Sequence, residues 1–149
     1  CLKTHGYGGV FTMSLKLSVG ITRKRNMAEL HSSFLSMRKM IAEINQLYHP
    51  ALVVLDGIEG FADGGPDNGT LVKPGVMLLG SDRVAIDAVG VALLRLNGGN
   101  RTISAGRVFD QEQIAPPWRS AWALPPPRRS SCSRQTRGAG RFDRSWKKS

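Results

Sequence analysis

The chain has 149 residues, 21 Lys and Arg against 11 Asp and Glu, a formal net charge of +10 and 41% hydrophobic residues. This length fits one folded domain with a modest core, and the composition excludes disorder over the whole chain. No apolar run reaches the roughly 18 residues that a helix needs to cross a bilayer. The two cysteines, Cys1 and Cys132, are too few for an iron–sulfur cluster or a four-thiolate zinc site.

The positive charge is concentrated in the last part of the chain. Residues 1–115 contain 12 Lys and Arg and 10 Asp and Glu, whereas residues 116–149 contain 9 Lys and Arg and one acid. The second segment is also rich in Pro and Ser and has no helical or strand period. We therefore expect a partial α/β domain over residues 1–115 and a basic tail over residues 116–149.

The tail has two interpretations, a disordered basic arm or a segment translated in a shifted reading frame. The single tryptophan codon constrains the DNA around Trp118, and one lost base before Pro116 would convert a helix-continuing sequence into the observed one. We favour the shifted frame. The chain also starts at Cys1 without Met, so we expect a fragment of a cytoplasmic protein, with an upstream export signal left open.

The first predicted elements are short. Lys3-Thr4-His5 with the following glycines predicts a strand end and a loop, and Phe11 to Val19 fits either a helix or a strand. Residues 27–48 predict one amphipathic helix, because apolar side chains recur at steps of three and four, and Pro50 ends it.

Two apolar runs, residues 51–55 and 76–79, predict strands buried on both faces, with a long loop over residues 57–74 between them. A helix is expected from Arg83 to Leu96, capped by Ser81 or Asp82 and ended by two glycines. A further helix is expected to start at Asp110. This order predicts an α/β fold, with a partial mixed or parallel sheet flanked by helices.

Acidic residues follow the two predicted strands. Because ligands bind outside the carboxyl ends of the strands in open α/β sheets, these two neighbouring strand ends are expected to place Asp56, Glu59 and Asp82 on one rim. Asp56 and Asp82 are candidate ligands of a divalent metal, and Asp56 is also a candidate acid or base. The alternative is structural, with Asp56 opening a turn and Asp82 capping a helix.

Further candidate ligand-binding residues lie near the same predicted rim. The glycine-rich loop contributes Gly65, Pro66 and Gly69, and Asp87 lies one turn into the following helix. For Asp87 the alternative is a carboxylate that interacts favourably with the helix N-terminus.

Three basic residues are candidate catalytic groups: Lys3, His5 and Lys16. Lys3 and His5 at a strand end beside glycines can hold an anion, and His5 can carry a proton or bind a metal. Lys16 stands alone in an apolar segment. The alternative is that the lysine stems lie along the surface with solvated amines.

Taken together, these motifs resemble the family catalogued as domain of unknown function 362, some members of which carry ferredoxin-type iron–sulfur domains. The resemblance covers nearly all of residues 1–115. It departs at Leu17, where the family pattern has Asn. The resemblance implies an α/β fold, a link to redox metabolism and a missing leading half, but no reaction. The segments that carry it are Lys3-Thr4-His5, Ser14-Leu15-Lys16, His31, Leu52 to Gly57, Glu59-Gly60, Gly65-Pro66, Gly69 and Gly80 to Val89.

Three functions follow from the sequence. The first is a small-molecule or metal-binding domain of a redox-linked enzyme, with a small anion and a divalent metal as expected ligands. The second is a non-catalytic module that partners a ferredoxin-like domain; this chain itself has no iron–sulfur cluster ligands. The third is nucleic-acid binding through the basic tail, which we rank last.

Overall fold

The computed structural model describes residues 1–6, 9–32, 34–47 and 49–114. The predicted tail, residues 116–149, lies outside this part. A four-stranded sheet has the order β2-β1-β4-β5, and its strands are β1 (Leu2–Thr4), β2 (Phe11–Thr12), β4 (Gly60–Asp63) and β5 (Thr70–Val72). Strands β1 and β4 are parallel, and the other two pairs in this sheet are antiparallel.

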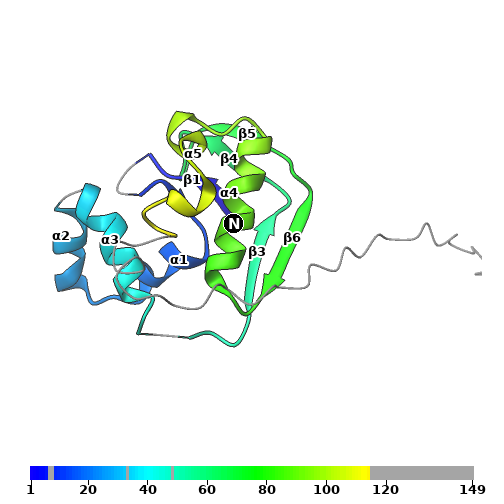
Figure 1. Ribbon diagram of the computed structural model, residues 1–149. Coiled ribbons are helices and arrows are strands. Elements are labelled where there is room, and N and C mark those ends of the chain that lie inside the picture. The colour runs from blue at the N-terminus through cyan, green and yellow to red at the C-terminus, as the bar shows by residue number, and fades with distance from the viewer. Residues whose placement is uncertain (7–8, 33, 48, 115–149) are drawn as a thin grey trace, which may run out of the picture.

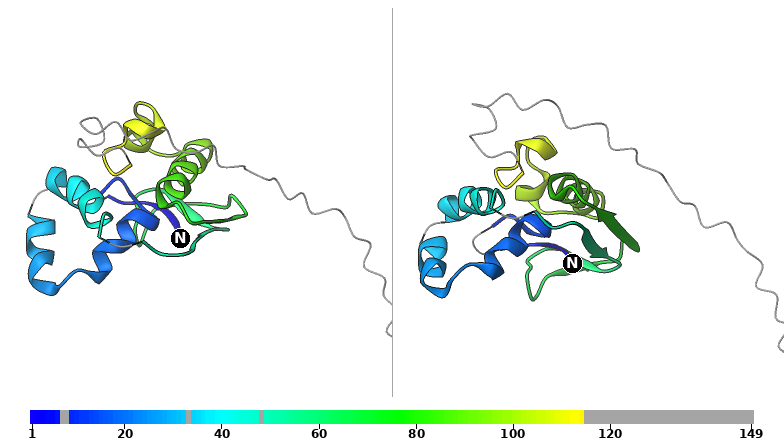
Figure 2. Two further views of the ribbon diagram at one scale, coloured as in Figure 1. Left: turned by 60° about the horizontal axis from the view of Figure 1, so that its bottom comes forward. Right: turned by 90° about the horizontal axis from the view of Figure 1, so that it is seen from below.

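A separate antiparallel pair is formed by β3 (Val53–Gly57) and β6 (Val76–Gly80). Figure 1 shows β3 and β6 on one side of the molecule, helices α2 (Lys24–His31) and α3 (Phe34–Ile44) on the other, and α4 (Arg83–Leu96) between them. The two views in Figure 2 agree with this arrangement. The predicted α/β class with a mixed sheet is confirmed.

Helix α4 (Arg83–Leu96) has the predicted bounds. It begins there because the Asp82 carboxylate accepts hydrogen bonds from the backbone amides of Val84, at 2.8 Å, and Ala85, at 3.1 Å. It ends before Gly98, whose φ of +85° is readily adopted only by glycine. Asp82 is thus a helix cap.

The predicted helix over residues 27–48 is instead two helices, α2 and α3, so that prediction is wrong. The backbone carbonyl of Glu29 accepts hydrogen bonds from both the amide and the hydroxyl of Ser32. Serine side chains that bond to nearby carbonyls compete with helical hydrogen bonds, and here the first helix ends beside Ser32. His31, the last residue of α2, is exposed.

The predicted loop over residues 57–74 contains β4 and β5, so its assignment as a loop is also wrong. Gly60 permits β4 to pair with β1, because a β-carbon on Gly60 would lie 2.0 Å from the carbonyl oxygen of Leu2. The glycines that suggested irregular structure therefore allow two strands to approach each other.

Strands β3 and β6 are buried on one face, not on both as predicted. Helix α4 contacts both strands. On the opposite face, the side chains of Val54 and Leu79 are 54% and 63% exposed, and these residues are register partners. The run of apolar residues has no alternation, so its pattern does not indicate that one face is open.

The short elements hold the core together. The apolar segment from Phe11 to Val19 forms β2, then α1 (Ser14–Leu17) and the start of a 3₁₀ turn, η1 (Ser18–Ile21). Gln113 is 1% exposed, and its side-chain oxygen accepts a hydrogen bond from the Val10 amide at 2.6 Å. The core contains fully buried side chains from most of these elements: Leu2, Phe11, Met37, Ile41, Val91, Leu94, Ile103 and Ile114.

The helix predicted from Asp110 is also wrong within the described residues. After α5 (Arg101–Ser104), the chain forms a 3₁₀ turn, η2 (Val108–Asp110), and Asp110 is its last residue. The Asp110 carboxylate accepts a hydrogen bond from the backbone amide of Arg107. In the part of the chain that the structure describes, no helix has the length and apolar character to cross a membrane.

Candidate functional site

The candidate site lies at the carboxyl ends of the parallel strands β1 and β4. Strand β1 leads into His5 and Gly6, and β4 leads into Gly64 and Gly65. The two segments are joined, since the Gly6 amide donates to the Gly65 carbonyl at 2.8 Å. Ligands of α/β proteins commonly bind outside the carboxyl ends of parallel strands, so this edge is a suitable place for a binding site.

Three basic side chains gather at this edge, and we call Lys3, His5 and Lys16 the cationic cluster. All three are partly buried. The Lys3 amine donates a hydrogen bond to the carbonyl of Pro66 at 3.2 Å, which ties β1 to the glycine-rich loop. These residues were predicted as site residues from their side-chain chemistry, and the fold brings them within electrostatic range of one another.

Burial and neighbouring positive charges both lower the pKa values of His5 and Lys16. Burial, followed by the charges of Lys16 and Lys3, lowers the pKa of His5 from 6.5 to about 4, and Asp67 opposes this shift. Burial and the charge of Lys3 lower the pKa of Lys16 below its ordinary value. A group of cations that disfavour one another's charges is stabilised by a bound anion.

Lys16 is positioned by a buried carboxylate. Asp87 on α4 is fully buried and accepts hydrogen bonds from the Ser14 amide at 2.8 Å, the Ser14 hydroxyl at 2.6 Å and the Leu15 amide at 3.0 Å. Burial raises the pKa of Asp87 to about 6, and these hydrogen bonds oppose the increase. Both oxygens of Asp87 therefore hold the start of α1, the helix that carries Lys16.

The glycine-rich loop fits tightly against the strands. A β-carbon on Gly65 would lie 2.2 Å from the Thr4 carbonyl oxygen, and one on Gly69 would lie 2.0 Å from that of Asp63. The Gly65–Pro66 peptide bond is cis. Gly65 and Pro66 thus lie beside the cationic cluster, whereas Gly69 precedes β5.

Asp56 and Asp82 do not share a rim, so this expectation is wrong. It assumed parallel strands, but β3 and β6 are antiparallel, and Asp56 pairs with Met77. Asp82 lies five positions after Met77 in the chain, a span of roughly 17 Å in an extended strand. A single metal ion between these two carboxylates is therefore excluded by the topology.

The predicted acidic residues have other partners. The Asp56 carboxylate accepts from the Ile58 amide at 3.0 Å, as expected of a turn opener. Glu59 forms an exposed ion pair with Lys73 at 2.7 Å. Among the described residues, no three His, Cys, Asp or Glu side chains are grouped so that they could hold a metal ion.

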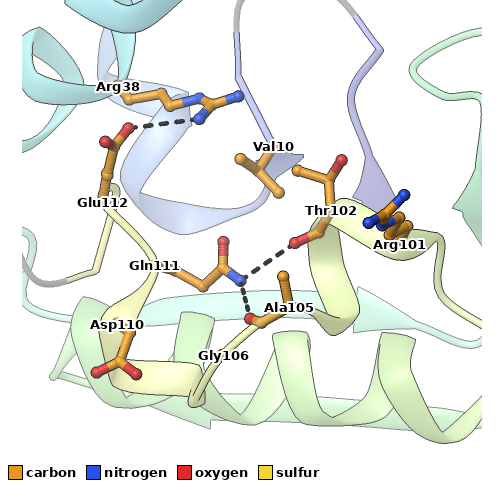
Figure 3. A pocket seen from close by; sticks show the side chains of 9 residues that line it. All are labelled: Val10, Arg38, Arg101, Thr102, Ala105, Gly106, Asp110, Gln111 and Glu112. Carbon is orange, nitrogen blue, oxygen red and sulfur yellow. Dashed lines mark hydrogen bonds and ion pairs between the residues drawn. The ribbon is translucent and has the colours of Figure 1, made fainter.

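A separate open pocket of about 520 Å³ is lined by none of the predicted site residues. Figure 3 shows Arg38 and Glu112 paired across it and the Gln111 amide directed at backbone carbonyls. The Arg38–Glu112 ion pair has a distance of 3.4 Å. In this pocket the charges of Arg38 and Glu112 have opposite signs and pair with each other, whereas the cationic cluster gathers basic side chains only.

A family model described as domain of unknown function (DUF362) matches residues 1–92. The chain belongs to this family. The DUF362 match spans the cationic cluster, the glycine-rich loop and Asp87, so all of these belong to the family domain. No curated protein and no solved structure matches the chain.

One supporting residue of this DUF362 domain, Asn45, was not predicted from the sequence. Asn45 donates to the Leu15 carbonyl at 2.7 Å and to the Ser18 hydroxyl at 3.0 Å, and its own carbonyl accepts from Arg83 at 2.7 Å. Asn45 therefore links α3 to α1 and to the start of α4. One signal was available, because a polar residue on the apolar side of a predicted helix needs buried partners.

Proposed function

We propose that this domain binds a small anion at the cationic cluster. The observation that carries the proposal is the placement of two lysines and a histidine at the carboxyl ends of β1 and β4. The charges of Lys16 and Lys3 add to the effect of burial in disfavouring a positive charge on His5, Lys3 does the same at Lys16, and the charge of Asp67 counters the effect at His5. A carboxylate or phosphate group would offset these effects by pairing with the amines.

Each residue of the cationic cluster has a distinct part in this proposal. Lys3 is held by Pro66 and contributes a fixed charge. Lys16 is carried by a helix that Asp87 anchors, so its amine is directed by the fold. His5, with a pKa of about 4, is neutral at pH 7, and a bound anion would make it gain a proton more readily.

Isothermal titration calorimetry with oxalate and with inorganic phosphate tests the proposal. We expect binding that weakens with added salt, and Lys3→Met and Lys16→Met to reduce the affinity by about 10- to 100-fold, the value of a charged hydrogen bond. Lys39→Met is the matched control, because Lys39 is an exposed lysine on α3. Equal effects of all three substitutions, or no binding of either anion, would refute the proposal.

Two other functions stay predictions. Docking of a ferredoxin-like domain would use surfaces other than the cationic cluster. Binding of nucleic acid would use residues 116–149, which lie outside the described residues.

A further inference from the structure

One side of α4 that faces solvent carries apolar residues only. Ala85, Val89, Ala92 and Leu96 follow one another at steps of four, three and four, so they form one stripe along the helix. Val89 is 47% exposed and Leu96 is 82% exposed, and the two alanines are partly exposed. A surface helix normally presents polar residues to water, so an apolar outer side is normally covered by another element. We call these four residues the outer stripe.

The middle of α4 lies over the middle of β6. A β-carbon on Gly90, near the centre of α4, would lie 3.3 Å from the Leu55 side chain of β3. Leu55 is the register partner of Leu78, the middle residue of β6. Nearer the start of α4, a β-carbon on Gly80 at the end of β6 would lie 3.3 Å from Ile86. Helix α4 therefore runs back along β6, and the centres of the two elements are at the same level.

The outer stripe and the free edge of β6 lie on the same side of the molecule. Among the described residues β6 pairs with β3 alone, and Figure 1 shows β6 as the outermost labelled strand beside α4. Strand β3 is nearer the centre, because a β-carbon on its Gly57 would lie 3.6 Å from Leu2 of β1. On its central side α4 carries Asp87, which accepts a hydrogen bond from Ser14 of α1. The outer stripe is about 180° around the helix from Asp87, and so it lies beside the free edge of β6.

We propose that two copies of this chain associate through this face, with β6 pairing antiparallel to β6 and α4 packing against α4 about one two-fold axis. The β3–β6 pair then becomes a four-stranded sheet. Helices that each lie over two strands of such a sheet are two strand spacings apart, roughly 10 Å, which is the packing distance of two helices. One axis serves both contacts because the centres of α4 and β6 are at the same level. No residue of the cationic cluster takes part, so the proposal is independent of the anion site.

The outer stripe is complementary to itself when two copies of α4 run antiparallel. With the axis at the centre of the stripe, Ala85 meets Leu96 of the second copy, and Val89 meets Ala92 of the second copy. A small side chain is thus opposite a large one in all four contacts, which lets the two helices approach closely without voids. The antiparallel arrangement also places the positive end of each helix dipole beside the negative end of the other.

The free edge of β6 fits the same axis. With Leu78 at the centre, Met77 meets Leu79 of the second copy, so two exposed apolar side chains become cross-strand neighbours. Neither β6 nor the outer stripe contains a charged residue, so the two copies do not repel each other there. The face is roughly 20 Å long, the length of the fourteen residues of α4. Two such faces bury on the order of 1,000 Å², the lower limit for a specific interface, so we expect a reversible dimer of micromolar affinity.

Sedimentation velocity of the full chain in reducing buffer, across the micromolar range, tests the proposal. We expect a monomer–dimer equilibrium, and Val89→Glu to weaken it at least about tenfold, because the carboxylate is desolvated against Ala92 of the second copy. Ile21→Glu is the matched control, since Ile21 is an exposed apolar residue on η1 and should leave the equilibrium unchanged. Circular dichroism checks that both variants are folded. A chain that is monomeric throughout, or a dimer that Val89→Glu leaves unchanged, overturns the proposal.

Exchanging two side chains tests the antiparallel register. Ala92→Val sets two valines against each other and Val89→Ala leaves a gap, so each single substitution should weaken the dimer several-fold. The double variant Val89→Ala/Ala92→Val again places a small residue opposite a large one, and its dimer should be close to that of the wild type. Losses that simply add in the double variant overturn this register.

Hydrogen exchange at low and high protein concentration tests the strand contact. The amides of β6 should exchange several-fold more slowly in the dimer, because those on its free edge gain carbonyl partners, whereas β5 should be unchanged. A dimer in which β6 gains no protection overturns the pairing of the strands.

Discussion

Asp87 should connect the stability of the fold to pH. Its carboxylate is fully buried, and its pKa is raised from 3.8 to about 6. A carboxyl group with this shift binds a proton more tightly in the folded chain than in the unfolded chain. Its contribution to stability is therefore fully present below about pH 4 and is lost as the pH rises through 6, a change of about 3 kcal/mol.

The perturbation is Asp87→Asn, which removes the titrating group and keeps its shape. Asparagine is neutral at every pH, like the protonated aspartic acid. The unfolding free energy of the variant minus that of the wild type should therefore rise by about 3 kcal/mol from pH 4 to pH 7. Any part of this difference that does not depend on pH adds the same amount at both pH values. Asp87→Ala should instead destabilise the fold by about 2–4 kcal/mol at all pH values, because the amides of Ser14 and Leu15 lose their acceptor.

Urea unfolding followed by far-ultraviolet circular dichroism measures these differences at several pH values. The wild type alone is not sufficient, because the lowered pKa of His5 has the opposite effect: stability from His5 is present above about pH 6.5 and is lost as the pH falls through 4. The comparison with Asp87→Asn cancels the His5 contribution. A difference between the two proteins that stays constant from pH 4 to pH 7 would refute this reasoning.

Three further outcomes are expected. Gly65→Ala should lower the unfolding free energy by about 1–3 kcal/mol and weaken oxalate binding, because the added β-carbon would meet the backbone carbonyl of Thr4. Gly20→Ala is the control and should change neither quantity, because a β-carbon at Gly20 would lie in open space. Gln113→Ala should lower the unfolding free energy by about 1–3 kcal/mol in urea unfolding, because the amides of Val10 and Phe11 lose their acceptor; a loss below about 0.5 kcal/mol would contradict this. Oxalate affinity should rise as the pH falls from 7 to 5, and His5→Gln should abolish that rise in calorimetry; an unchanged pH profile would show that His5 does not take up the proton.

Local features of the sequence determined the elements that depend on near neighbours. Helix α4 could be predicted to the residue, because its cap at Asp82 and its end at Gly98 are local signals. The basic residues of the cationic cluster could be proposed from their types and from the glycines beside them. The proximity of Lys16 to Lys3 and His5 could not be predicted, because α1 is positioned by Asp87, which is more than 70 residues away along the chain.

The tertiary structure alone decided strand direction, and with it the location of the site. An apolar strand has the same pattern whether its neighbour is parallel or antiparallel, so Asp56 and Asp82 were placed together although β3 and β6 run in opposite directions. The parallel pair is β1 with β4, and β4 lay inside a segment whose glycines indicated a loop. The sequence by itself determined the α/β class and the chemistry of the side chains. Long-range pairing, made possible where Gly60 lets two backbones meet, decided which of those side chains share an edge.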